Sequence, residues 1–193
     1  VLKDLNQQTA GMIESYITED RLAEDYGLDA EQSSTAAPLI SDVFGYMGSA
    51  DMTEEECERE AEALNDVMNL VTNASDRANS GETTGQTVFG DDPNTSIMGK
   101  TAEDTVATFM ASESLKHSLD NNSKNGTLAE DPFGMQDMMA EEEKEDLKSA
   151  MGDYFANTEY ETEEEKAADK ETLTNLGKLF GFTSDEMKYI LGE

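Results

Sequence analysis

The chain has 193 residues, of which 44 are acidic and 13 are basic, so its formal net charge is −31. This charge argues against direct binding to DNA or RNA, because such binding depends on Lys and Arg side chains that neutralise phosphates. It also disfavours adsorption to an anionic membrane, and the single Cys57 excludes an intramolecular disulfide framework.

Hydrophobic residues make up 36% of the chain, and they recur at helical spacing instead of being spread thinly. We therefore expect a modest folded core, in which the 11 Met side chains fill irregular gaps. No apolar run reaches the length of about 18 residues that a membrane span needs, and the N-terminal residues 1–4 lack the apolar core of a signal peptide. Because the chain begins with Val instead of Met, its cellular compartment is left open.

The first part of the chain predicts two helices. Apolar residues at helical spacing predict the first over residues 3–25, and Gly27 is its expected end. Residues 29–37 are small and polar, which is typical of a linker. Pro38 then opens an apolar segment. Since proline fits the first turn of a helix, we expect a short, buried helix over residues 36–47.

The clearest amphipathic helix is predicted over residues 53–71. Thr53 and Glu56 have the spacing of a capping box, in which side chains satisfy the amide groups left unpaired at a helix start. Apolar residues then follow at spacings that place them on one buried face. We interpret Cys57 as a small buried side chain of that face, not as a nucleophile. The predicted face consists of Cys57, Ala61, Leu64, Met68 and Val71.

Residues 73–100 are the least regular part of the chain and are rich in Gly, Thr, Ser and Asn, as loops are. Within them, residues 86–89 and 95–98 are candidates for the strands of a small β-hairpin, which is marginally stable alone. A loop of this length is uncommon inside a compact domain and is usually functional or mobile. We expect this loop to carry specificity, and to be the place where a single domain over residues 1–193 would divide loosely.

The second part of the chain predicts further helices with polar connections. Thr162 and Glu165 have the spacing of a second capping box, and Gly181 is the expected C-terminal cap of that helix. A last short helix is expected to begin at Thr183 or Ser184. The whole chain therefore predicts an all-α fold, a compact bundle of about six or seven helices. The longer predicted helices of this part cover residues 101–119, 135–155 and 162–180.

The sequence holds no complete catalytic or phosphate-binding motif of the common types. His117 is the single histidine, so it cannot form a metal set of several histidines, and no Gly-x-Ser-x-Gly motif accompanies it. We interpret it as a surface or cap residue. The run Gly99-Lys100-Thr101 matches only the end of a phosphate-binding loop, because Asn94 stands where that loop needs its first glycine.

Residues 121–132 are the best candidate for a calcium site. Asn121 and Asn125 fall at ligand positions of an EF-hand loop, and Gly126 falls at its invariant glycine. The first ligand position lacks an acid, however, and Pro132 replaces the bidentate glutamate. We therefore interpret this stretch as a turn. Acidic triplets at residues 54–56, 141–143 and 163–165 lie near predicted helix starts, where the helix dipole explains them without catalysis.

These patterns favour a non-enzymatic, highly acidic helical module without cofactor or metal, which binds another protein, associates with itself or serves as a structural component of an assembly. The alternative is a nucleic-acid mimic, an acidic inhibitor of a basic DNA- or RNA-binding protein, as some phage-encoded proteins are. The scarcity of arginine, limited to Arg21, Arg59 and Arg77, motivates that alternative. An enzyme or a calcium-dependent protein is the third hypothesis, and adaptation to high salt is compatible with each of the three.

Overall fold

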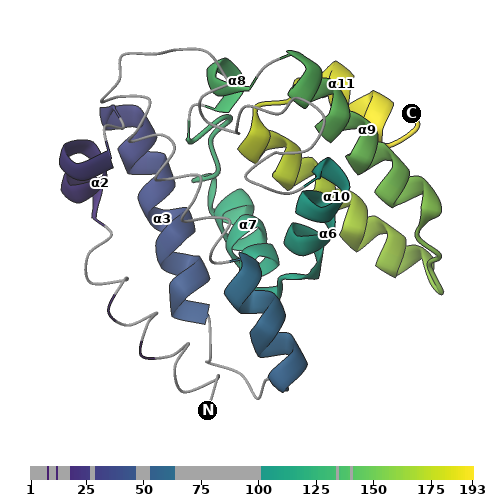
Figure 1. The fold of residues 1–193 in the computed structure, drawn as a ribbon, viewed down its shortest axis with the longest axis horizontal. Coiled ribbons are helices and arrows are strands. Elements are labelled where there is room, and N and C mark those ends of the chain that lie inside the picture. Colours follow the sequence, from purple (N-terminus) through teal and green to yellow (C-terminus); the bar gives the residue numbers. More distant parts are fainter. Residues whose placement is uncertain are drawn as a thin grey trace.

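The structure of the protein is a computed structural model, in which α-helices pack around one apolar core (Figure 1). The predicted all-α fold is confirmed, and the described part of the chain holds no strand. The predicted loop over residues 73–100 with its hairpin, and the second half of the predicted helix over residues 53–71, lie outside the described residues. The structure describes residues 8, 12, 18–26, 29–46, 53–63, 101–133, 135–139 and 141–193.

The first two described helices, α2 (Glu19–Tyr26) and α3 (Ala30–Tyr46), pack against each other. Helix α3 begins earlier than the predicted 36–47, so Pro38 lies inside the helix and not in its first turn. The cause is a cap that the prediction missed. The Asp29 carboxylate accepts a hydrogen bond from the Gln32 amide at 2.8 Å, and the Gln32 side chain accepts one from the Asp29 amide at 3.1 Å. This reciprocal bonding starts the helix within the predicted linker.

The predicted helix over residues 101–119 is two helices, α6 (Ala102–Ala111) and α7 (Glu113–Asn125). They meet at Ser112, whose extended backbone (φ −85°, ψ 115°) ends one helix and caps the other. The Ser112 hydroxyl accepts a hydrogen bond from the Leu115 amide at 3.1 Å. Helix α7 continues to Asn125, beyond the predicted end, and Gly126 terminates it in the left-handed conformation (φ 72°).

The predicted helix over residues 135–155 is also divided, into α8 (Met135–Met138) and α9 (Glu141–Asn157). The Asp131 carboxylate accepts hydrogen bonds from the Met135 and Gln136 amides and so caps the start of α8. The acidic residues 141–143, which the prediction placed within the first half of one helix, form the first turn of α9.

The last two helices, α10 (Glu163–Phe180) and α11 (Ser184–Ile190), lie close to their predicted bounds. The Thr162 hydroxyl accepts a hydrogen bond from the Glu165 amide at 3.1 Å, but the Glu165 carboxylate accepts from the Glu161 amide and not from Thr162. The predicted capping box is therefore half formed there. A complete capping box opens α11, where Thr183 is the N-cap. Gly181 ends α10 at φ 81°, as predicted.

The apolar core lies between α3, α7 and α10 and extends to α6, α9 and α11. Among its largest buried side chains, the Phe109 and Phe180 rings stack with centroids 5.8 Å apart, which joins α6 to α10. Helix α11 approaches α10 closely at Gly177, where an added Cβ atom would overlap the Met187 sulfur. The absence of a side chain at Gly177 thus leaves room for the Met187 side chain of α11.

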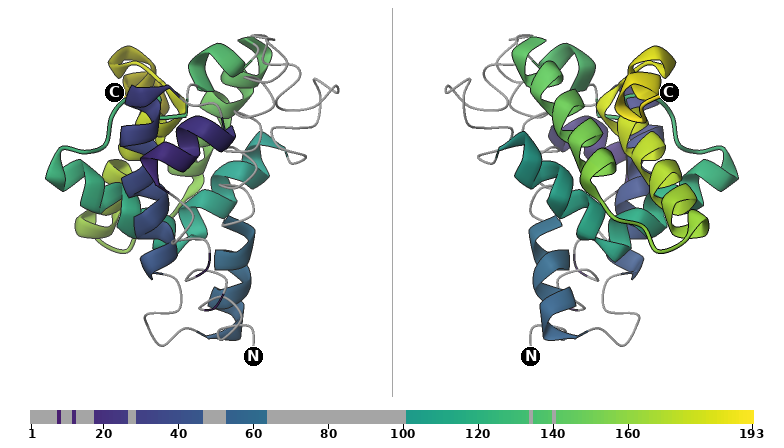
Figure 2. Two further views of the ribbon diagram at one scale, coloured as in Figure 1. Left: turned by 90° about the vertical axis from the view of Figure 1, so that its left-hand side faces the viewer. Right: turned by 90° about the vertical axis from the view of Figure 1, so that its right-hand side faces the viewer.

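Residues 54–63 are helical, and Figure 2 shows this helix at the lower end of the molecule. The predicted capping box is confirmed: the Glu56 amide donates to the Thr53 hydroxyl at 3.1 Å, and the Thr53 amide donates to the Glu56 carboxylate at 3.0 Å. Cys57 is buried as predicted. Ala61 was predicted to lie on the buried face but is only half-buried. The buried face includes an acidic residue, Glu60.

Glu60 is 1% exposed, and its carboxylate reaches the junction between α6 and α7. It accepts hydrogen bonds from the Ser112 hydroxyl at 3.0 Å, from the Glu113 amide at 2.7 Å, and from both the amide and the hydroxyl of Ser114. The first amides of a helix have no partner within the helix, and the dipole there favours a negative charge. The carboxylate therefore caps α7 from another helix and fastens residues 54–63 to the bundle.

Replacing Glu60 by alanine should lower the free energy of unfolding by about 3 kcal/mol, because buried donors at the start of α7 lose a charged acceptor. Urea denaturation followed by circular dichroism measures this change. The matched control is Glu62→Ala in the same helix, where the side chain is exposed and the expected change is within about 0.5 kcal/mol. Equal denaturation midpoints for the two variants would contradict the capping role.

Candidate functional site

The candidate residues that the sequence suggested for catalysis, phosphate binding and calcium binding do not form one site in the structure. His117 is exposed on α7, where its ring stacks on Tyr46 at 4.5 Å between centroids. Thr101 is the N-cap of α6 and accepts a hydrogen bond from the Asp104 amide at 3.1 Å, while Gly99 and Lys100 lie outside the described residues. Thr101 therefore has a structural role at a helix start.

The asparagines of the candidate calcium stretch take part in internal hydrogen bonds. Asn121 and Asn122 both donate from their side-chain amides to Asp42 of α3, at 2.9 and 2.8 Å. The Asn122 side-chain oxygen accepts from the Thr127 hydroxyl at 2.6 Å. Within the described residues, no group of three or more His, Cys, Asp or Glu side chains has an arrangement that could hold a metal ion. The stretch thus joins α7 to α3 and closes the end of α7.

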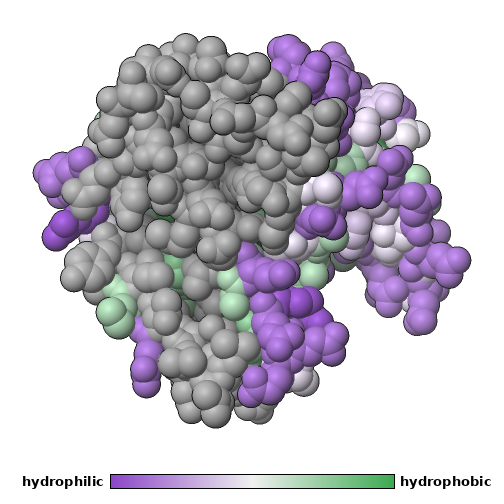
Figure 3. Space-filling view, viewed as in Figure 1, coloured by the Kyte–Doolittle hydropathy of each residue, from purple (hydrophilic) through white to green (hydrophobic). Residues whose placement is uncertain are grey.

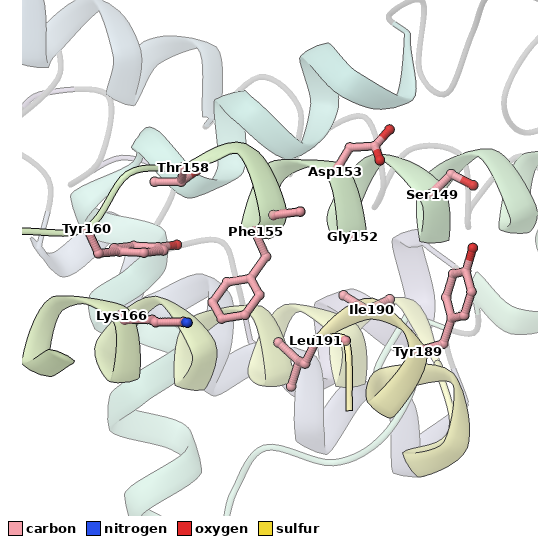
Figure 4. A pocket seen from close by; sticks show the side chains of 12 residues that line it. Ser149, Gly152, Asp153, Phe155, Thr158, Tyr160, Lys166, Tyr189, Ile190 and Leu191 are labelled. Atoms are coloured by element: carbon pink, nitrogen blue, oxygen red, sulfur yellow. The ribbon is translucent and has the colours of Figure 1, made fainter.

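A different part of the molecule has a hollow in its surface. It has a volume of about 610 Å³ and lies between the end of α9, the first half of α10 and the end of α11 (Figure 4). We call it the aromatic groove, because side chains with rings come from α9, from the connection to α10 and from α11. Its main lining residues are Phe155, Tyr160, Lys166, Tyr189, Ile190 and Leu191.

One end of the aromatic groove is formed by two rings and a lysine. The centroids of Phe155 and Tyr160 are 5.9 Å apart with the ring planes tilted by 50°, and Lys166 Nζ lies 5.8 Å from the Phe155 centroid. In Figure 4 the Tyr160 ring and the Lys166 side chain both extend toward Phe155. The Tyr160 hydroxyl donates to Asp169 Oδ2 at 2.9 Å, which fixes the ring against α10.

The other end of the groove is formed by Tyr189, which is 64% exposed and extends toward α9 (Figure 4). Lys148 Nζ lies 5.2 Å from the centroid of that ring and donates a hydrogen bond to Glu145 at 3.0 Å. The hydrogen bond to Glu145 raises the pKa of Lys148 above its usual value, although partial burial acts in the opposite direction. An ammonium group therefore lies over an aromatic ring at each end of the groove.

Local bonding places Tyr160 in the groove. After α9, the amide and the hydroxyl of Thr158 both donate to the Tyr154 carbonyl, at 3.1 and 2.5 Å, which turns the chain back toward α10. The apolar pattern of the predicted helix over residues 135–155 includes Phe155, whereas Tyr160 falls between two predicted helices and Tyr189 falls in the last short one. The position of Tyr160 was itself a signal. It lies in a short polar connection between the predicted helices over residues 135–155 and 162–180, where a tyrosine ring is expected to pack beside one of the two helices.

A second, smaller hollow of about 270 Å³ lies on the other side of the α11 C-terminal residues. Lys170, Lys178 and Lys188 line it, and Lys170 forms an ion pair with Glu193. These lysines belong to a hollow that is separate from the aromatic groove. Lys166 is therefore the α10 lysine that faces the groove.

Comparison with protein-family models, curated proteins and solved structures finds no significant match for this chain. No helix among the described residues is both long and apolar enough to cross a membrane. Function is therefore inferred from the groove and from the distribution of surface charge.

Tyr160 should contribute stability to the folded protein that is lost at alkaline pH. Burial, followed by the hydrogen bond to Asp169 and the charge of that residue, raises the pKa of Tyr160 above its usual value of about 10. The unfolded chain therefore loses this proton first, so the stabilising contribution is complete below about pH 10 and is lost as the pH rises above it.

Thermal unfolding measured across this alkaline range should show a steeper loss of stability in the wild type than in Tyr160→Phe. Asp169→Asn keeps an acceptor but removes its charge, and its tyrosinate absorbance should develop at lower pH than in the wild type. Identical alkaline profiles for the wild type and Tyr160→Phe would contradict the assignment.

Proposed function

We propose that this protein is a non-enzymatic interaction module that binds a partner protein in the aromatic groove. The observation that carries this proposal is a hollow of about 610 Å³ with the exposed Tyr189 ring at one end, the half-buried Phe155 ring at the other, and half-buried Leu191 in its lining. Aromatic side chains are enriched in protein interfaces and among the few residues that contribute most of the binding energy. A ring as exposed as Tyr189 adds little to the packing of its own chain.

The polar groups near the aromatic groove support binding more than catalysis. The Tyr160 hydroxyl donates to Asp169, and the Thr158 hydroxyl donates to a backbone carbonyl. Both groups therefore hold the walls of the groove in place. Burial and the hydrogen bond to Asp169 raise the pKa of Tyr160, so this hydroxyl stays protonated near neutral pH and is not activated as a nucleophile.

Charge favours a basic partner. The net charge of −31 produces a negative potential that accelerates encounter with a positively charged protein and weakens as salt is added. Figure 3 shows mostly hydrophilic side chains over α9 and the beginning of α10 on the face in view. The aromatic groove thus combines ring and aliphatic side chains with polar lining residues within a charged surface, an arrangement that suits an interface with aromatic anchors and a polar rim.

Replacing Tyr189 by alanine should weaken partner binding about tenfold or more, because an aromatic anchor is lost. The matched control is Met12→Ala, since Met12 is 66% exposed and Tyr189 is 64% exposed. Wild-type and variant proteins are used to capture partners from the source cell's lysate at low and high salt, and captured proteins are identified by mass spectrometry. Affinity for the purified partner is then measured. Equal affinity of Tyr189→Ala and Met12→Ala would refute docking in the groove.

A second candidate function, nucleic-acid mimicry, is favoured by one row of carboxylates. Glu54, Glu58 and Glu62 are exposed on successive turns of the helix at residues 54–63, with about 6 Å of axial rise between neighbours. Regularly spaced negative charges on a projecting helix are the feature that a basic nucleic-acid-binding groove would recognise. Arg59 pairs with Glu55 at 3.4 Å beside this row and does not interrupt it.

If mimicry is correct, changing Glu54, Glu58 and Glu62 together to glutamine should weaken binding at least tenfold and flatten its salt dependence. The control removes three exposed charges from α9 by changing Glu141, Glu142 and Asp146 to the corresponding amides. Titrations of the identified partner at several salt concentrations distinguish the two sets. Equal effects of both triple variants would reduce the row to general electrostatic attraction and count against mimicry.

A further inference from the structure

We propose that the aromatic groove binds a cationic side chain of the partner, an arginine or a lysine, and that Lys166 occupies this position in the free protein. This inference rests on the proposed function, since it names the chemistry of the segment that docks in the groove. It assigns the binding position to the corner between Phe155 and Tyr160. The charge of the chain and the geometry of its own lysines both support this assignment.

The ring faces of the groove already accept ammonium groups from the chain itself. Lys166 Nζ lies 5.8 Å from the Phe155 centroid, and Lys148 Nζ lies 5.2 Å from the Tyr189 centroid. Both distances are within the range in which the negative face of an aromatic ring attracts a cation. The guanidinium of arginine can stack on such a ring as well, and a neutral side chain would gain no comparable electrostatic attraction.

Carboxylates near the two ends of the groove favour a positive ligand over a negative one. Asp169 accepts a hydrogen bond of 2.9 Å from the Tyr160 hydroxyl, so a carboxylate adjoins that ring. Glu159 and Glu161 are exposed on either side of the same tyrosine, and Glu145 lies beside Lys148 at the Tyr189 end. The remaining α10 lysines face the neighbouring hollow, where Lys170 is paired with Glu193.

Lys148 and Lys166 differ in their ion pairing and exposure, and this difference indicates which of the two ring positions a cation of the partner can occupy. Lys148 has an ion pair with Glu145 at 3.0 Å, and its side chain is only 18% exposed. Lys166 is exposed, and among the described residues no carboxylate lies within ion-pair distance of it. Its long side chain can therefore leave the Phe155 ring for solvent at small cost, which vacates the position for a cation from the partner.

The test uses the full chain and two capped peptides, acetyl-Gly-Arg-Gly-amide and its citrulline counterpart, which is nearly isosteric but neutral. Binding is followed by NMR titration. The arginine peptide should perturb the signals of Phe155 and Tyr160, and Lys166→Ala should bind it about two- to fivefold more tightly than the wild type. The citrulline peptide should bind several-fold more weakly to both proteins. Lys124→Ala removes an exposed lysine from α7 and controls for the change in net charge.

Three results would contradict the proposal, and each of them contradicts a different part of it. Equal binding of the arginine and citrulline peptides would overturn the preference for a cation while leaving docking in the groove intact. Equal tightening by Lys124→Ala and Lys166→Ala would show a general charge effect and overturn the role of Lys166. Failure of the arginine peptide to bind even Lys166→Ala would overturn the cation site altogether. The capture experiment with Tyr189→Ala and Met12→Ala decides the proposed function independently of these outcomes.

Discussion

The carboxylate of Glu60 ends inside the protein, where water cannot solvate it, so it must find hydrogen-bond donors. It finds them at Ser112, Glu113 and Ser114, where one helix stops and the next begins. The break at Ser112 lets α6 and α7 take different directions, so α6 packs against α9 while α7 packs against α3 and α10. Helices α9 and α10 form two walls of the aromatic groove. The arrangement of that groove therefore depends on the junction that Glu60 caps.

Two glycines lie where the third wall of the groove packs against its neighbours. Gly177 allows α11 to approach α10, because the Met187 sulfur occupies the space that a side chain would need. On the other side, Gly152 of α9 faces the backbone of Ile190, and a Cβ atom built there would lie 3.6 Å from the Ile190 carbonyl oxygen. Helix α11 is thus held between its neighbours, and the residues at its end line the hollow.

The acidic residues of this protein have more than one physical role. Those in the first turns of α9 and α10 complement the helix dipole, and all of them except the buried Glu143 remain in solvent. Glu60 satisfies a helix start from inside the core, and Asp169 orients a tyrosine of the groove. The local chemistry of the groove is aromatic and receives ammonium groups, within a chain of net charge −31. The surrounding charge and the aromatic rings both favour a positively charged ligand.

The sequence by itself determined the all-α class and several helix starts, such as Thr53 with Glu56, because capping and apolar periodicity act between residues a few positions apart. It did not reveal the break at Ser112 or the burial of Glu60, since those two residues bond across a separation of 52 positions. The groove likewise combines Phe155, Tyr160 and Tyr189 from separate segments, and only one of them belonged to a predicted apolar stripe. Tertiary packing decided these features, because which side chains meet depends on the direction each helix takes after its cap.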